Sequence, residues 1–323
     1  MSKPMQPQKP YSIYHTLLAF DIDLAEIEGL DAARLINDSR KLAKQDIFCA
    51  VVGTEQDGRQ YIDQAIASGA ALVLAQCQHE QQHGKLISRK HADKTVFIVQ
   101  FYQLDIHLFA LAKGYYQSPQ DSMTMIGITG TNGKTSTSQI IAKLMGSCQK
   151  SCAVIGTTGA GKLDALQPLE NTTPGATQLH QLLSEFSQQN ISHVAMEVSS
   201  HALEQGRLTA ELIDIAVFTN LSHDHLDYHQ TMDNYAEAKR RLFTCGAGQI
   251  AVVNGDDSYA KRWLRNWPQE QRVIVFGRDH QITQYPAHVY AGDIAHNANG
   301  VEFLLSTHLG KSRVKSALIG DFN

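Results

Sequence analysis

The segment Met125–Thr137, MIGITGTNGKTST, constrains the fold of this chain more than any other part of its sequence. An apolar run of strand character leads into a glycine-rich turn, and the pattern predicts a helix that begins near Lys134. In such a turn Gly130 and Gly133 let backbone N–H groups point at phosphate oxygens, and the helix N-terminus adds a positive dipole. Lys134 would reach the terminal phosphates, and Thr135 would offer a hydroxyl to Mg2+. The segment therefore predicts a phosphate-binding loop that follows a strand.

The spacing of this loop is a variant of the common GxxxxGK[ST] pattern, because Ile128 stands where the first glycine is expected. A glycine-rich turn can also be purely structural, but the Lys-Thr pair directly after the glycines favours phosphate. The loop leaves the nucleobase open, since no guanine-specific NKxD motif follows it.

Short apolar runs alternate with amphipathic stretches on both sides of a polar segment, 117–122 (QSPQDS). This rhythm is typical of strands and helices in α/β folds. Because the segment contains Pro119, we interpret it as a linker between a small N-terminal α/β domain, 1–118, and a central phosphate-loop domain, 119–323. The central domain is predicted to hold a mostly parallel sheet flanked by helices, with a hairpin over 288–306 that turns at Asn-Gly.

Composition excludes several classes of protein. Hydrophobic residues make up 43% and charged residues 19% of the 323 residues, as in globular rather than disordered proteins. A net charge of -4 gives no reason to expect nucleic acid as a partner. Five scattered cysteines are typical of reduced thiols, and neither a membrane-spanning run nor a signal core is evident. We therefore expect a cytoplasmic protein with no membrane partner.

Three further blocks follow predicted strands, at the edge where open α/β sheets place ligands: 171–176 (NTTPGA), 196–207 (MEVSSHALEQGR) and 219–229 (TNLSHDHLDYH). Glu197 ends a buried strand and is placed to hold Mg2+ through its carboxylate. Without the neighbouring motifs, Glu197 would rather be interpreted as a strand-end carboxylate that has only structural partners. The histidines and aspartates of 223–229 also allow a zinc site, although their spacing matches no common zinc motif.

Together with NDSR (37–40) and VVGTEQDGRQYI (51–62), these blocks resemble those of the Mur ligases, which build the peptide of peptidoglycan. The resemblance runs from about Asn37 to the final GDFN, and it is greatest to the members that add the third amino acid. It implies an amide bond between the D-glutamate of UDP-MurNAc-L-Ala-D-Glu and the amine of that amino acid. ATP, with Mg2+, would activate the γ-carboxylate as an acyl phosphate, which the amine then attacks.

The resemblance also implies roles for individual residues around ATP. The phosphates are expected on the loop residues Gly130, Thr131, Asn132, Gly133, Lys134, Thr135 and Ser136. The magnesium ions are expected on Thr135, Glu197, His225 and Lys239. Lys134, His225 and Lys239 are the implied catalytic residues, with Lys239 carboxylated by CO2. On its helix alone, Lys239 would be interpreted as part of a solvent-facing basic patch.

For the sugar nucleotide, the resemblance implies two sets of contacts. The uridine diphosphate end is expected on Asn37, Ser39, Thr54, Glu55 and Gln56. The muramoyl-dipeptide portion is expected on Asn171, Thr172, Thr173, Ser199, Gln205 and Arg207. Arg207 suits a carboxylate or phosphate, because its guanidinium can donate two parallel hydrogen bonds.

Mur ligases continue past the GDFN block into a third domain that closes over ATP and reads the third amino acid, whereas this sequence stops at Asn323. From the residues of the blocks we expect meso-diaminopimelate as the third amino acid, with L-lysine as the alternative. Because the third domain is the lid over ATP, we do not count on turnover by this chain alone. Folylpolyglutamate synthetase shares the phosphate loop but lacks a domain like 37–116. A second rival is a non-catalytic module that binds only the sugar nucleotide. The resemblance also implies a monomer.

Overall fold

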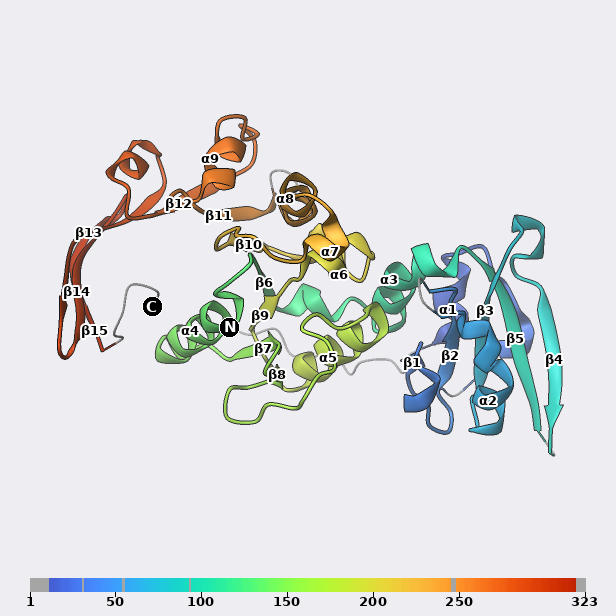
Figure 1. Ribbon diagram of the computed structural model, residues 1–323. Helices are drawn as coiled ribbons and strands as arrows, with labels where there is room; N and C mark the ends of the chain where they lie inside the picture. Colours follow the sequence, from blue (N-terminus) through green and yellow to red (C-terminus); the bar gives the residue numbers. More distant parts are fainter. Residues whose placement is uncertain (1–11, 31, 54–55, 93, 245–247, 318–323) are drawn as a thin grey trace. The chain divides into compact units, whose positions relative to one another are not determined.

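A computed structural model describes residues 12–30, 32–53, 56–92, 94–244 and 248–317 (Figure 1). The described residues form two compact units, 12–122 with 174–189, and 123–173 with 190–317. The domain boundary at residue 118 stays a prediction. No helix in the described ranges combines the length and the apolar character that a membrane crossing needs.

The first unit is built on a five-stranded sheet in the order β1-β2-β3-β5-β4. Its first three pairings along that order are parallel, and β4 pairs antiparallel with β5. The strands are β1 (Leu35–Ile36), β2 (Ile47–Ala50), β3 (Leu72–Cys77), β4 (Leu86–His91) and β5 (Lys94–Tyr102). The helices are α1 (Ile13–Leu18), α2 (Ile62–Ala67), α3 (Leu104–Tyr115) and α5 (Ala176–Gln188). Short 3-10 turns are η1 (Ala25–Ile27), η2 (Ser39–Lys41), η3 (Gly58–Tyr61), η4 (Glu80–Gln82) and η5 (Pro119–Ser122).

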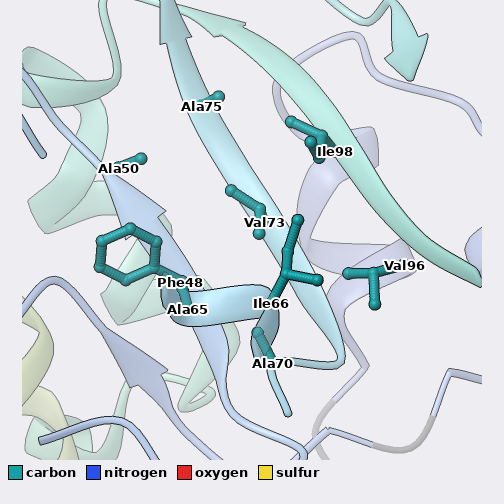
Figure 2. Packing of buried hydrophobic residues seen from close by; sticks show 9 residues of the cluster. All are labelled: Phe48, Ala50, Ala65, Ile66, Ala70, Val73, Ala75, Val96 and Ile98. Carbon is teal, nitrogen blue, oxygen red and sulfur yellow. The ribbon is translucent and has the colours of Figure 1, made fainter. Parts of the chain in front are cut away.

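Figure 2 shows the apolar core between α2 and the middle of this sheet. Each of the strands β2, β3 and β5 contributes two residues spaced two apart, which places both side chains on one face. The cluster consists of Phe48, Ala50, Ala65, Ile66, Ala70, Val73, Ala75, Val96 and Ile98. Because burying one Val or Ile side chain contributes about 1.5–3 kcal/mol, this layer holds α2 on the sheet.

An ion pair with a buried carboxylate directly precedes β2. Both carboxylate oxygens of Asp46 accept hydrogen bonds from Arg34, at 3.1 Å from Nε and 2.6 Å from Nη2. The backbone N–H of Ala43 donates to the same carboxylate at 2.8 Å. The side chain of Asp46 is only 1% exposed, so these donors replace the water that the carboxylate loses on folding.

Helix α5 lies, in chain order, within the second α/β series predicted from the sequence, but it packs in the first unit, against α3, β1 and η5. Its buried face includes Leu179, His180, Leu183 and Phe186, which recur at helical spacing. The segment 117–122, predicted to be a linker, forms the 3-10 turn η5 with buried Pro119. Proline suits the first position of such a turn, because its φ is already helical.

The second unit holds a ten-stranded sheet in the order β15-β14-β13-β12-β11-β10-β6-β9-β7-β8 (Figure 1). The pairings from β13 to β7 are parallel, and the two ends of the sheet are antiparallel. The strands are β6 (Thr124–Thr129), β7 (Cys152–Gly156), β8 (Gly159–Gly161), β9 (His193–Glu197), β10 (Ile215–Phe218), β11 (Ile250–Asn254), β12 (Val273–Gly277), β13 (His288–Asn297), β14 (Gly300–Thr307) and β15 (Gly310–Ser316). The predicted α/β class and the mostly parallel sheet are confirmed.

The helices of the second unit are α4 (Lys134–Ser147), α6 (Ser200–Glu204), α7 (Leu226–His229), α8 (Met232–Arg240) and α9 (Ser258–Leu264). Three 3-10 turns are η6 (Ala210–Leu212), η7 (Arg241–Phe243) and η9 (His280–Gln284). Strand β6 pairs with β9 on one side and with β10 on the other, all parallel. The loops that follow these three strands therefore leave the same edge of the sheet, and this edge carries the candidate site.

Candidate active site

The loop 130–133 joins β6 to α4 and depends on two glycines. A Cβ atom at Gly130, where φ is +150°, would lie 1.9 Å from Oγ1 of Thr219. Gly133 is the N-terminal cap residue of α4 and has a left-handed φ of 84°. Glycine is required at both positions, at the first by close approach and at the second by conformation.

The loop after β10 holds this turn from the side. The N–H groups of Thr131 and Asn132 donate to O and Oδ1 of Asn220 at 2.9 and 3.0 Å, and Oγ1 of Thr219 donates to the carbonyl of Asn132 at 2.7 Å. Two of the N–H groups expected to face phosphate are therefore engaged. The N–H groups of residues 133–136, at the start of α4, have no acceptor within the described part of the chain, so they are the donors available to an anion.

Two lysines converge on this turn. Nζ of Lys134 donates to the carbonyls of Gly130 and Thr131, both at 2.9 Å, and Nζ of Lys239 donates to the carbonyl of Gly130 at 3.0 Å. Burial lowers the pKa of Lys134. Burial, and then the charge of Lys134, lower the pKa of Lys239 to about 7. Lys239 is 1% exposed, so it does not belong to a solvent-facing basic patch.

Tyr235 shapes the surroundings of Lys239. Nζ of Lys239 lies 4.4 Å from the centre of the Tyr235 ring, a cation–π contact. The hydroxyl of Tyr235 lies 3.3 Å from Oγ1 of Thr131, and His229 stacks on the ring at 4.9 Å. Tyr235 thus links α8 to the phosphate loop.

Glu197, at the end of β9, is buried beside the first turn of α4. Its Oε1 accepts from Oγ1 of Thr135 at 2.9 Å and from the N–H of Thr157 at 3.0 Å. A Cβ atom at Gly156 would lie 2.0 Å from the same Oε1, so glycine leaves room for the carboxylate. A hydroxyl and a carboxylate oxygen side by side are hard ligands that suit Mg2+ together with phosphate oxygens.

His225 has contacts with other residues. It caps α7 with a left-handed φ of 52°, and its side chain is 47% exposed. Its ring contacts the rings of His201 and Tyr235, at 5.2 and 5.9 Å between centres. Among the described residues no three His, Cys, Asp or Glu side chains converge as a metal site, and the zinc alternative for 223–229 stays a prediction.

The residues expected to contact the muramoyl-dipeptide gather around Thr173. Its Oγ1 donates to the carbonyl of Glu197 at 2.9 Å and accepts from the N–H of Ser199 at 3.0 Å. The guanidinium of Arg207 donates to the carbonyl of Thr173 at 3.2 Å. Burial lowers the pKa of Arg207, and no carboxylate in the described ranges pairs with it. This half-buried cation is suited to receive an anionic ligand.

The other members of that set differ in position. Thr172 lies within 3.0 Å of Thr157, hydroxyl to hydroxyl, and so adjoins the Glu197 carboxylate. Asn171 and Gln205 are exposed. All three belong to the second unit.

In the first unit, the expected nucleotide contacts follow the carboxyl ends of β1 and β2, which pair in parallel. Asn37 directly follows β1, and Ser39 opens the turn η2. Gln56 is exposed, and the hydroxyl of Tyr61 donates to its Oε1 at 3.4 Å. Thr54 and Glu55 lie outside the described residues.

Sequence reasoning missed the residues that hold the site in shape. Thr219 and Asn220 lie in the block 219–229, which pointed only to His225, and Tyr235 and Thr157 lie outside every block. The spacing of Tyr235 and Lys239, four residues apart on one helix, was the available signal, because such residues share a helical face.

Comparison with known protein families agrees with this geometry. Residues 128–323 match the Mur ligase middle domain, and residues 34–114 match the catalytic-domain model of the Mur ligase family. The chain belongs to the Mur ligase family. The expectation that the sequence raised is thereby confirmed at the level of the family.

The curated proteins that this chain resembles include several ligases with one name. One of them is the UDP-N-acetylmuramoyl-L-alanyl-D-glutamate–2,6-diaminopimelate ligase of Vibrio vulnificus, 40% identical over 307 residues, which are 95% of this chain and 60% of that protein. A solved structure of a ligase with the same name is 31% identical, with a TM-score of 0.75 over 96% of this chain and 60% of that one.

A third relative shares the fold alone. The MurF ligase of Thermotoga maritima, solved in complex with ADP, is 19% identical, with a TM-score of 0.58 over 88% of this chain and 58% of that one. The present chain thus spans about three fifths of the length of the Mur ligases that it matches.

Proposed function

We propose that the two units belong to an ATP-dependent amide ligase that adds meso-diaminopimelate to the D-glutamate of UDP-MurNAc-L-Ala-D-Glu in peptidoglycan precursor synthesis. The observation that carries the proposal is the convergence of Lys134 and Lys239 on the turn that precedes α4, beside the Thr135–Glu197 pair. The 40% identity to the Vibrio vulnificus ligase supports the choice of the third amino acid.

ATP is proposed to place its phosphates on residues 130–136. The free N–H groups of 133–136 would donate to phosphate oxygens, and Lys134 would exchange its carbonyl partners for the terminal phosphates. The γ-carboxylate of the substrate attacks the γ-phosphate, ADP leaves, and the acyl phosphate forms. The incoming amine then expels phosphate, so the protein contributes positioning and charge neutralisation rather than acid–base chemistry.

Mg2+ would be held by Thr135 and Glu197, with His225 and Lys239 as the further proposed ligands. When bound, it would neutralise charge on the phosphates. For Lys239 we propose carboxylation, in which the neutral amine attacks CO2, a C–N bond forms and one proton is released. A pKa of about 7 leaves a large neutral fraction of this amine at neutral pH, which the reaction requires.

For the sugar nucleotide, each unit is proposed to supply its own set of contacts. Asn37, Ser39 and residues 54–56 would hold the uridine diphosphate, and the set around Thr173 would hold the muramoyl-dipeptide. Arg207 would receive a carboxylate or phosphate of this ligand, because it is half buried and the hydrogen-bond acceptor that it has among the described residues is a neutral carbonyl, that of Thr173.

Calorimetric binding of UDP-MurNAc-L-Ala-D-Glu to this chain tests the proposal, with UDP-MurNAc-L-Ala as the control. We expect micromolar or tighter binding that requires the glutamate, which corresponds to about -8 kcal/mol. A folded chain that binds neither compound would overturn the sugar-nucleotide assignment and leave a phosphate-loop protein of another substrate.

Two alternatives are tested by product formation. Incubation with ATP, UDP-MurNAc-L-Ala-D-Glu and either meso-diaminopimelate or L-lysine distinguishes the two amino acids. Binding of the sugar nucleotide without any amide product from this chain would support the second alternative, a non-catalytic sugar-nucleotide-binding fragment. We further infer that the protein is cytoplasmic and that its domains span 1–118 and 119–323. We also infer that it is a monomer, and gel filtration tests this oligomeric state.

A further inference from the structure

A buried hydroxyl on α5 holds an exposed amide at the end of β1. Thr177, 2% exposed, donates from Oγ1 to Oδ1 of Asn37 at 2.8 Å. Both residues lie in the first unit, although 140 positions separate them in the chain. Thr177 is the second residue of α5, so no helical carbonyl lies four residues before it, and its hydroxyl donates to a side chain at the carboxyl edge of the sheet.

This contact sets the polarity of the amide. A side-chain amide offers one acceptor oxygen and two N–H donors. If the Asn37 amide were reversed, the buried Thr177 hydroxyl would lose the acceptor that it has among the described residues, and an unsatisfied buried donor is unfavourable. Oδ1 therefore faces Thr177, and the N–H groups of Asn37, an exposed residue, have no acceptor within the described ranges and are available to a ligand.

We propose that Thr177 is a positioning residue that makes Asn37 a pure hydrogen-bond donor toward the nucleobase. Such a group donates a hydrogen bond to a base that presents a carbonyl oxygen, as uracil does at O4. It disfavours a base that presents an amino group there, as cytosine does at N4, because two donors would then face each other. This inference rests on the proposed function, in which the first unit holds the nucleotide. It adds the reason for a preference for uridine over cytidine.

The alternative is that the pair only fastens α5 to β1. That role would affect the stability of the first unit and the affinity for every nucleotide equally. A change in the ratio of the affinities for UDP and CDP distinguishes a positioning role of Thr177 from a purely structural one, because loss of the fold lowers both affinities together.

The experiment measures calorimetric dissociation constants of UDP and CDP for the 323-residue chain and its variants, alongside thermal unfolding. We expect the unmodified chain to prefer UDP by about tenfold or more, and T177V to lower that ratio to about threefold or less, because the freed amide can reverse. T177S keeps the hydroxyl and should restore the ratio. T16V is the matched control, since Thr16 is also buried in this unit and donates to the carbonyl of Ser12 at 2.9 Å.

A second variant covers the case in which T177V does not fold. N37D replaces the amide by a carboxylate that can only accept, so the UDP to CDP ratio should fall below that of the unmodified chain even if both affinities drop. An unchanged ratio in folded T177V or N37D overturns the role of Thr177 while UDP binding persists. If the folded, unmodified chain binds neither nucleotide, the nucleotide assignment of the proposed function fails, and the role of Thr177 fails with it.

Discussion

Lys134 and Lys239 donate to one and the same acceptor, the carbonyl oxygen of Gly130, at 2.9 and 3.0 Å. Two ammonium groups on one carbonyl repel each other, and within the described ranges neither lysine has an ion-pair partner. Loss of the Lys239 proton removes the cost of burying its charge and also the repulsion from Lys134, which is why burial and then that charge lower its pKa to about 7. The site therefore holds a reactive amine at the expense of folding stability.

Replacing Lys239 by methionine should stabilise the fold at low pH. The folded state resists protonation of this amine, so from about pH 7 to 10.5 the unfolded chain binds more protons and the unmodified chain gains stability as pH rises. K239M lacks that gain. At pH 6, where the amine is charged, we expect K239M to raise the free energy of unfolding by about 1–3 kcal/mol. Urea unfolding between pH 6 and 9.5 measures the difference.

The control for that series is K143M, because Lys143 is exposed on α4. K143M should follow the unmodified chain at every pH. A stability difference for K239M that stays constant across the range would contradict the lowered pKa.

Gly156→Ala should displace the carboxylate of Glu197, because the new Cβ would lie 2.0 Å from Oε1. We expect binding of ATP in the presence of Mg2+ to weaken by about tenfold or more, since the carboxylate must leave both Thr135 and Thr157. Calorimetry with and without Mg2+ measures this. G146A is the matched control, since nothing lies within 4 Å of a Cβ on Gly146. Equal affinity in both variants would refute the role of Gly156.

Asp46→Asn should destabilise the first unit by about 2–3 kcal/mol, because the substitution removes a buried negative charge that faces Arg34 and the N–H of Ala43. The expected readout is an earlier urea transition of this unit. Asp63 also pairs with an arginine, Arg89, but its side chain is 81% exposed, so D63N should change little. Similar losses of stability in the two variants would show that burial of the carboxylate does not determine how much the ion pair contributes to the free energy of unfolding.

His180 should make the first unit sensitive to acid. Burial lowers its pKa to about 4, while Nδ1 donates to the carbonyl of Ala176 at 3.0 Å. Between pH 6.5 and 4 the unfolded chain binds more protons than the folded one, so stability is lost as pH falls through this window. H180L should remove about 2–4 kcal/mol of that loss. Urea unfolding at pH 7 and pH 4.5 tests this, with H15L, at an exposed histidine, as control.

The sequence predicted the elements whose pattern is local. The strand and helix around Lys134 and the hairpin over 288–306 follow from apolar periodicity and turn residues within a few positions. The strand β4 was missed because five of its six residues are exposed on an edge strand, which leaves no apolar alternation to detect. The partners of the site, Thr219 with Asn132 and Tyr235 with Lys239, depend on which strands become neighbours.

Helix α5 has a consequence for the order in which the chain can fold. The first unit needs residues 174–189, and the chain reaches them only after β6, α4, β7 and β8 of the second unit. No single cut of the chain yields the two units intact. During synthesis the first unit must wait for residue 189 before its helix layer is complete, so a nascent chain released earlier leaves apolar side chains of α3 uncovered. Early termination within this span should therefore yield chains that aggregate rather than a stable first unit.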